Sequence, residues 1–477
     1  MSDARWGALI FSSAFLARLL AGLGSAIFGT DGCHYLLMAD WMRAGRFHDA
    51  LSLAYHPMYP LLIAAARTFT AGTEQAGPLV SIVLGAAAAV PLFLVAKSVF
   101  GRPTAVFAGL LYAFYPRVVE LHGDVMTEGT FMFFLFSSLW LTHRIMEEPT
   151  LERGAVLGAA AAGAFLTRPE GLLAIAFAVG WPVLEALRTR DRWGLRAGGL
   201  LLTVAVLLLA LSPYLLWVKS VRGGWALTVR PSAIAATGSE TRVEKEAQST
   251  SSRYRAYLVA VLRLSMYGLL IPFYVAGVAA LRRVEARKAL FYLSFPLAYL
   301  AAILFAIRTH DFMTERYLMP GMVLLGALAA HGMVAAIRTA ARRCPDRPWV
   351  PTACGAAVLL IVAAPVFRCF QIRRTELLSF PGAARWIVAR HGAPVAVTGL
   401  EQVSYYCGSR SYYLPAARGE FEDFLRRQPM DYIAYSDKEL RTDPEFVAML
   451  RSCDRLEAPL QYEGPPGTWK VYFQRVK

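Results

Sequence analysis

Ionisable side chains gather in four groups close to the ends of long apolar runs in this sequence. Charges at membrane depth or at its edge are costly and are often functional. A carboxylate there can take a proton from a hydroxyl, and arginine can stabilise a departing phosphate through two parallel hydrogen bonds. Structural ion pairs in loops have the same composition, so both interpretations stay open here. The groups are Asp31, His34 and His56; Arg117, Glu120, His122, Asp124 and Glu128; Arg168 and Glu170; and Arg308, His310, Asp311, Glu315, Arg316 and Tyr317.

The elements that must position these groups are membrane-spanning helices. The chain has 477 residues, of which 56% are hydrophobic and only 17% are charged, and its mean hydropathy is +0.42. Apolar runs near the length needed to cross a hydrocarbon core recur along most of it. We therefore predict a polytopic α-helical membrane protein with about eleven spans, the first retained rather than cleaved. The predicted spans are 6–27, 78–99, 103–117, 129–146, 154–167, 171–188, 197–218, 264–281, 288–307, 316–337 and 349–366.

The basic loops predict the orientation of these spans. With the N-terminus in the cytoplasm, all four basic loops fall on the cytoplasmic side, as the positive-inside rule requires. The C-terminal segment and all four ionisable groups then lie on the outer side. Convergence on one side favours a catalytic site over scattered ion pairs. The basic loops are 97–102, 188–196, 281–288 and 338–347.

Two external loops bear on this site. In the first, residues 28–77, the segments "HYLLMADWMRAG" and "PMYPLLIAAARTF" are expected to form helices in the headgroup zone, lining the site or merely capping the bundle. The loop 219–263 contains a polar run without apolar period, which fits either a lid or disorder.

The C-terminal segment has a different pattern. From about residue 367 to 477, helix-like stretches alternate with the strand-like "APVAVTG", "DYIAYSD" and "TWKVYFQRV". We therefore divide the chain into a transmembrane domain, 1–366, and a small extracytoplasmic α/β domain, 367–477. The formal net charge is +15, yet residues 371–477 hold 15 Lys and Arg against 13 Asp and Glu. The surplus therefore belongs to the membrane-spanning part, which argues against nucleic acid as a partner.

Six cysteines show no spacing typical of metal ligands. Cys407 and Cys453 fall in the same predicted outer domain and could pair in an oxidising compartment, but free buried thiols are equally compatible with the sequence.

Several motifs, in order, carry a resemblance to a known family. They are "DGCHYLLMADWMRAG" with "HPMYPLL", "MTEGTFMFFLF", "GAFLTRPEGLLA" and "ERYLMPGMVLL". The sequence resembles the GT-C superfamily of integral-membrane glycosyltransferases, in its bacterial protein-mannosyltransferase and aminoarabinose-transferase-like branch (family 39/83 type). The resemblance covers roughly residues 6–337.

This resemblance implies an enzyme of the bacterial inner membrane with a periplasmic site. Such enzymes transfer a sugar from a polyprenyl phosphate to a glycan, lipid or protein acceptor, with inversion. The resemblance implies Asp31 as general base, Glu128 as a second acid, and His56, Arg168, Arg316 and Tyr317 as the residues holding the donor phosphate or lipid.

The sequence departs from the family in one position and leaves one role open. Gly32 follows Asp31 where many relatives have a second acid, which weakens the case for a two-carboxylate metal site there. Because cationic residues could take the place of a metal at the phosphate, no metal or other cofactor is predicted. Asp124 lies about one helical turn before Glu128, so the second acid could be either residue.

Two other functions compete with the enzyme. A flippase or transporter of lipid-linked sugars would place ionisable groups near the bilayer midplane and often shows internal repeats, and neither is seen. The second competing possibility is a relative of these enzymes that has no catalytic activity. The sugar, the acceptor, the polyprenol length and the oligomeric state are not determined by the sequence.

Overall fold

The computed structural model describes residues 2–53, 55–188, 193–228, 250–266, 268–306, 314–347, 349–394, 396–409, 411, 414 and 418–477. Most of the polar run in the 219–263 loop, and Arg308, His310 and Asp311 of the fourth ionisable group, lie outside these residues.

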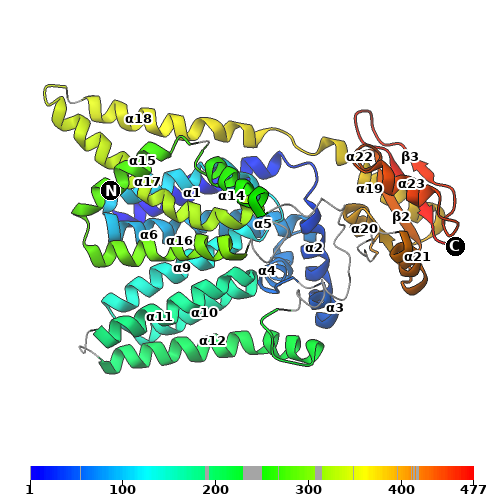
Figure 1. Cartoon of the computed structure of the whole chain (residues 1–477), viewed down its shortest axis with the longest axis horizontal. Helices are drawn as coiled ribbons and strands as arrows, with labels where there is room; N and C mark the ends of the chain where they lie inside the picture. The colour runs from blue at the N-terminus through cyan, green and yellow to red at the C-terminus, as the bar shows by residue number, and fades with distance from the viewer. Residues whose placement is uncertain are drawn as a thin grey trace.

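A bundle of long apolar helices forms most of the molecule (Figure 1). Within the described residues, six helical segments are long and apolar enough to cross a membrane, and a bent pair, α7 with α8, makes a seventh. The six are α1 (Asp3–Leu23), α5 (Thr73–Ala87) with α6 (Ala89–Phe100), η2 (Pro169–Gly171) with α11 (Leu172–Arg188), α12 (Trp193–Arg222), α16 (Ala286–Ala306) and α17 (Glu315–Arg343).

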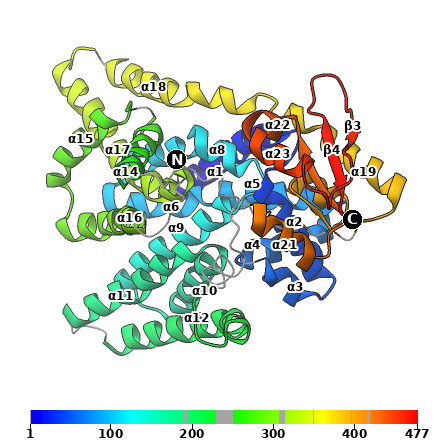
Figure 2. The same cartoon turned by 45° about the vertical axis from the view of Figure 1, so that its right-hand side comes forward.

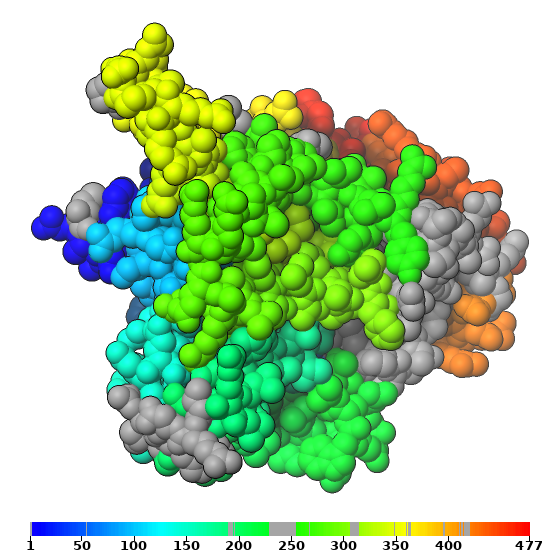
Figure 3. Space-filling model, turned by 60° about the vertical axis from the view of Figure 1, so that its left-hand side comes forward, coloured from blue at the N-terminus to red at the C-terminus, as the bar shows by residue number. Residues whose placement is uncertain are grey.

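The other predicted spans coincide with helices that do not meet this criterion alone. The bent pair is α7 (Arg102–Ala113) and α8 (Pro116–His122), which meet at 55°. The remaining ones are α9 (Glu128–Glu147), α10 (Leu151–Thr167), α15 (Ile271–Ala280) with η3 (Leu281–Arg283), and α18 (Trp349–Ala363), which continues into η4 (Ala364–Phe370). A count of eleven spans therefore stays a prediction. The end of α17 and the start of α18, yellow in Figure 3, project beyond the neighbouring helices.

One predicted boundary was wrong. The sequence predicted a loop up to residue 263 and a span from 264, but residues Thr250–Leu264 form helix α14, and α15 begins only at Ile271. The apolar residues of α14 recur at helical spacing, so that Ala260 and Leu264 are buried where the helix packs on α17. Because the first residues of α14 are polar, the sequence alone did not indicate this amphipathic helix.

Small residues let the bundle helices approach closely. A Cβ atom on Gly154 of α10 would lie 2.2 Å from the carbonyl oxygen of Gly199 on α12. A Cβ on Gly277 of α15 would lie equally close to the carbonyl oxygen of Leu328 on α17. Both contacts require glycine, because any side chain would push these backbones apart.

The loop 28–77, which the sequence predicted to be external, is helical, as expected. It forms α2 (Thr30–Arg43), α3 (Phe47–Ser52), α4 (Met58–Ala66) and η1 (Arg67–Phe69), and α2 packs on α4 and α5. His34 of the first ionisable group is buried, with its ring stacked 5.4 Å from that of Tyr55. Helix α2 is therefore covered on more than one side.

The C-terminal segment folds around a four-stranded sheet of order β1-β2-β4-β3. Strand β1 (Val397–Thr398) is parallel to β2 (Tyr432–Ser436), and β4 (Val471–Arg475) is antiparallel to both β2 and β3 (Leu460–Tyr462). The surrounding helices are η5 (Thr375–Leu377), α19 (Ser379–His391), α20 (Glu401–Tyr406), α21 (Arg418–Arg427), α22 (Asp437–Thr442) and α23 (Pro444–Arg451). In Figures 1 and 2 this part lies at the end of the bundle that carries α2, α3 and α4.

Alternation along β2 separates the two cysteines that the sequence left as a possible pair. Cys407 packs with Tyr432 and Ala434 on one face of the sheet, and Cys453 packs with Ile433 and Tyr435 on the other. Both thiols are free.

A short clamp joins the C-terminal segment to the first span. The backbone of Arg373 pairs with the residues after α1: its N–H donates to the carbonyl of Gly24 at 2.8 Å, and its carbonyl accepts from the N–H of Ala26 at 3.1 Å. The Arg373 guanidinium lies 3.2 Å from the Glu120 carboxylate, and also donates to the carbonyl of Ala21. The clamp holds the C-terminal segment beside the start of α2.

Candidate active site

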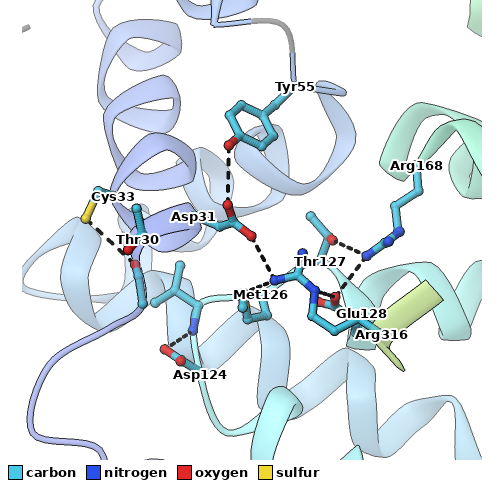
Figure 4. Close-up of polar contacts among 12 residues, drawn as sticks. Thr30, Asp31, Cys33, Tyr55, Asp124, Met126, Thr127, Glu128, Arg168 and Arg316 are labelled. Carbon is cyan, nitrogen blue, oxygen red and sulfur yellow. Dashed lines mark hydrogen bonds and ion pairs between the residues drawn. The ribbon is translucent and has the colours of Figure 1, made fainter. Parts of the chain in front are cut away.

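Five charged side chains from different helix ends form one continuous chain of ion pairs, much of which is drawn in Figure 4. The Nη1 atom of Arg316 lies 2.8 Å from Oδ2 of Asp31, and its Nε atom lies 3.0 Å from Oε1 of Glu128. The same Glu128 oxygen accepts a hydrogen bond of 2.9 Å from Nη1 of Arg168. Nη2 of Arg168 in turn pairs with Oε1 of Glu170 at 3.1 Å. The order is therefore Asp31, Arg316, Glu128, Arg168, Glu170.

Helix ends place these five groups together. Asp31 and Glu128 lie in the first turns of α2 and α9, where the helix dipole favours a negative charge. Arg168 is the C-cap of α10, where the dipole favours a positive charge. Arg316 is the exception, because it lies in the first turn of α17. Two carboxylates within 3.0 Å offset that unfavourable position.

Burial divides the five groups into one accessible carboxylate and a protected interior. The side chain of Asp31 is 30% exposed, whereas that of Glu128 is 1% exposed and those of Arg168 and Glu170 are about 10% exposed. Asp31 is therefore open to an approaching group, while Glu128 is enclosed between two arginines. Of the two predicted acids that the structure brings together, only Asp31 has the access that a general base needs.

Two tyrosines complete this cluster, of which one was not predicted. The hydroxyl of Tyr55 donates to Oδ1 of Asp31 at 3.3 Å, although nothing in the spacing between them indicated the contact. The ring of Tyr317 lies 5.2 Å from the Arg168 guanidinium in a cation–π contact.

His56 occupies a more apolar place. It is 6% exposed, and its ring packs against Phe165 at 5.3 Å and Tyr214 at 5.2 Å. It lies within electrostatic range of Glu170, so it borders the far end of the ion-pair chain rather than Asp31.

Asp124 lies apart from the other predicted acids. The sequence suggested that it shares a helix face with Glu128, which is wrong, because α8 ends at His122 and Asp124 lies in the turn before α9. Its Oδ2 pairs with Nη1 of Arg374 at 2.7 Å, and its Oδ1 accepts from the N–H of Val125. Asp124 therefore contacts the clamp to the C-terminal segment.

The C-terminal segment reaches the start of α2. Helix α20 packs on α2, where the Gln402 amide donates to Oγ1 of Thr30 at 3.4 Å and the Tyr405 ring meets Phe28 at 5.4 Å. Burial raises the pKa of Glu401, and the Glu439 and Asp31 carboxylates raise it further. The Glu401 carboxyl of the C-terminal segment thus lies within electrostatic range of Asp31.

Among the residues that the structure describes, no group of three or more His, Cys, Asp or Glu side chains is arranged to hold a metal ion. Independence of a metal cofactor stays a prediction.

The chain matches one family model and is similar in fold to several solved structures. Residues 55–217 match the family model described as dolichyl-phosphate-mannose-protein mannosyltransferase. No curated protein sequence matches the chain. The structure is similar to the crystal structure of ArnT from Cupriavidus metallidurans bound to undecaprenyl phosphate, at 15% identity and a TM-score of 0.61 over 99% of this chain and 98% of that one.

A second solved structure has the same architecture. The archaeal oligosaccharyltransferase AglB from Archaeoglobus fulgidus, in complex with an inhibitory peptide and a dolichol-phosphate, is 12% identical with a TM-score of 0.61, over 97% of this chain and 74% of that one. The family-model match and this shared fold confirm the resemblance that the sequence motifs predicted: the chain has the GT-C fold of integral-membrane glycosyltransferases.

Proposed function

We propose that the protein transfers a sugar from a polyprenyl phosphate to an acceptor hydroxyl on the outer side of the bacterial inner membrane, with inversion. The observation that carries this proposal is the accessible Asp31 carboxylate at one end of a chain of ion pairs containing two arginines. The similarity to proteins solved with undecaprenyl phosphate and dolichol-phosphate supports a lipid-linked donor.

In this reaction the acceptor oxygen attacks the anomeric carbon while the bond from that carbon to the phosphate oxygen breaks. The electron pair leaves with the polyprenyl phosphate, and the hydroxyl proton passes to Asp31. Arg316, whose side chain is 20% exposed, is the cation best placed to receive the phosphate. A phosphate on Arg316 would compete with Asp31 for the guanidinium and so release the carboxylate for proton transfer.

Other predicted residues position Asp31 and Arg316 or their neighbours. Glu128 fixes both guanidinium groups from inside, and Tyr317 and Glu170 position Arg168. We assign Glu128 to positioning, and we assign Asp124 to the contact with the C-terminal segment rather than to proton transfer.

The test is transfer of radiolabelled sugar by purified full-length protein in lipid, from a pool of polyprenyl-phosphate sugars to a membrane extract. Asp31→Asn should lower the rate by roughly two to four orders of magnitude while donor binding persists. Asp40→Asn is the matched control, because it makes the same change nine residues further along α2, where the carboxylate accepts from Thr73. The control should retain its rate.

Two outcomes would contradict the proposal. If Asp31→Asn transfers as fast as wild type, Asp31 is not the base. If wild type transfers no label but moves the donor lipid across the bilayer, the protein is a flippase.

A further inference from the structure

A charged cavity lies at the end of the bundle opposite Asp31. It has a volume of about 270 Å³ and is lined by the ends of α6 and α15, by η3, by the start of α16 and by α17. Along α17, Arg316 of the candidate active site and Arg338 of this cavity are 22 residues apart, which is about 33 Å at 1.5 Å per residue. That distance matches the hydrocarbon thickness of a bilayer. The cavity therefore opens near the other membrane surface, which the basic loops predict to be cytoplasmic.

The cavity carries an excess of positive charge. Its lining includes Arg283, Lys288 and Arg338 but only one acid, Glu285, which pairs with Lys288 at 3.5 Å. Within the part of the chain that the structure describes, no carboxylate forms an ion pair with Arg283 or Arg338. Two guanidinium charges are thus left for a ligand, and arginine forks suit phosphate.

One wall of the cavity is formed by a buried and packed side chain. His331 of α17 is 8% exposed, its Nδ1 lies 3.2 Å from Oγ1 of Thr104, and its ring packs against Phe100 at 5.1 Å. Its Nε2 makes no hydrogen bond of acceptable geometry to a described residue, although the Ala280 carbonyl lies close to the ring. The packed His331 side chain therefore forms one side of the cavity, with the Ala280 carbonyl beside its ring.

Exposed apolar side chains on two of the lining helices indicate what kind of phosphate the cavity takes. Val278 of α15 and Leu290 of α16 are 58% and 62% exposed, as expected for residues that face acyl chains. Figure 1 shows α15 and α16 at the end of the molecule away from the C-terminal sheet, and Figure 3 turns that end toward the viewer. Val278 and Leu290 are two residues from the lining residues Ala280 and Lys288, so a lipid whose headgroup enters the cavity would have its acyl chains at the depth of these two helices.

We propose that this cavity binds the phosphate of an anionic phospholipid from the inner leaflet. The volume corresponds to roughly nine water molecules at about 30 Å³ each, which accommodates a phosphate with its glycerol. Basic pockets between spanning helices on the cytoplasmic side bind such headgroups. The site is separate from the proposed sugar transfer, and its existence does not depend on that activity.

The experiment is a titration of the purified full-length chain in detergent with phosphatidylglycerol, with bound lipid counted by native mass spectrometry. The test variant is Arg283→Gln with Arg338→Gln. The matched control is Arg282→Gln with Arg343→Gln, which removes the same charge from neighbouring exposed positions that do not line the cavity. At about fivefold per basic residue, the test variant should bind the first lipid roughly 25-fold more weakly, and the control should bind like wild type.

Further controls distinguish binding at a specific site from general attraction to surface charge. Phosphatidylcholine should not bind tightly, and inorganic phosphate in millimolar excess should not displace phosphatidylglycerol. Equal weakening in both double variants would overturn the site, because the effect would then be general surface charge. Displacement by inorganic phosphate would overturn the lipid assignment. Both variants should show the thermal midpoint of wild type without added lipid, and a lower midpoint for the test variant alone would attribute its weaker binding to misfolding and overturn the proposal.

Discussion

Removal of the Glu128 charge tests whether the ion-pair chain is the buried centre of the site. The Glu128→Gln substitution keeps the shape of the side chain but takes a carboxylate that is 1% exposed from between Arg168 and Arg316. Breaking a buried ion pair from one side costs about 3–5 kcal/mol, because the remaining charges stay buried. At about 2.1 cal/mol/K of unfolding entropy per residue, 477 residues give about 1 kcal/mol/K. We therefore expect the thermal midpoint to fall by about 3–5 °C.

Glu120→Gln is the matched control. Glu120 also lies between two arginines, Arg117 at 2.8 Å and Arg373 at 3.2 Å, but its side chain is 36% exposed. Exposed pairs contribute about 1 kcal/mol or less, so its midpoint should fall by no more than about 1 °C. Both midpoints are measured by differential scanning fluorimetry of detergent-solubilised protein. Equal falls would refute the reasoning, and a higher midpoint for Glu128→Gln would mean that desolvation of these charges outweighs their pairing.

Two further predictions concern the C-terminal segment. Burial raises the pKa of Glu401 above its ordinary value of 4.5, so the folded state loses stability as pH rises through and above that value. Glu401→Gln should therefore raise the thermal midpoint at pH 7–8 but not at pH 4. A difference in midpoint that does not depend on pH would contradict this. Arg374→Gln leaves the 5%-exposed Asp124 carboxylate without its partner, so proteolysis of the segment 364–378, which contains η4, the clamp and η5, should become roughly 10- to 100-fold faster. Arg390→Gln, at an exposed position on α19, should leave that rate unchanged, and equal cleavage of both variants would show that the Asp124 pair does not hold the clamp.

The sequence by itself determined the features that repeat along the chain or depend on near neighbours. Apolar runs predicted the helical bundle, and the short helices α2 and α4 followed from their local pattern. The strands β2 and β4 were predicted from β-branched and aromatic stretches. Each of these signals lies within one segment, so a single sequence contains it.

Only the tertiary structure decided which charges meet. Asp31 and Arg316 are 285 residues apart and join because the starts of α2 and α17 pack at the same end of the bundle. Asp124, only four residues before Glu128, turns instead to Arg374 of the C-terminal segment. The cavity around Arg283 and Arg338 likewise arises where separate helices end side by side. Such meetings depend on helix packing and on the turns between helices, and neither leaves a periodic signal in the residues that it brings together.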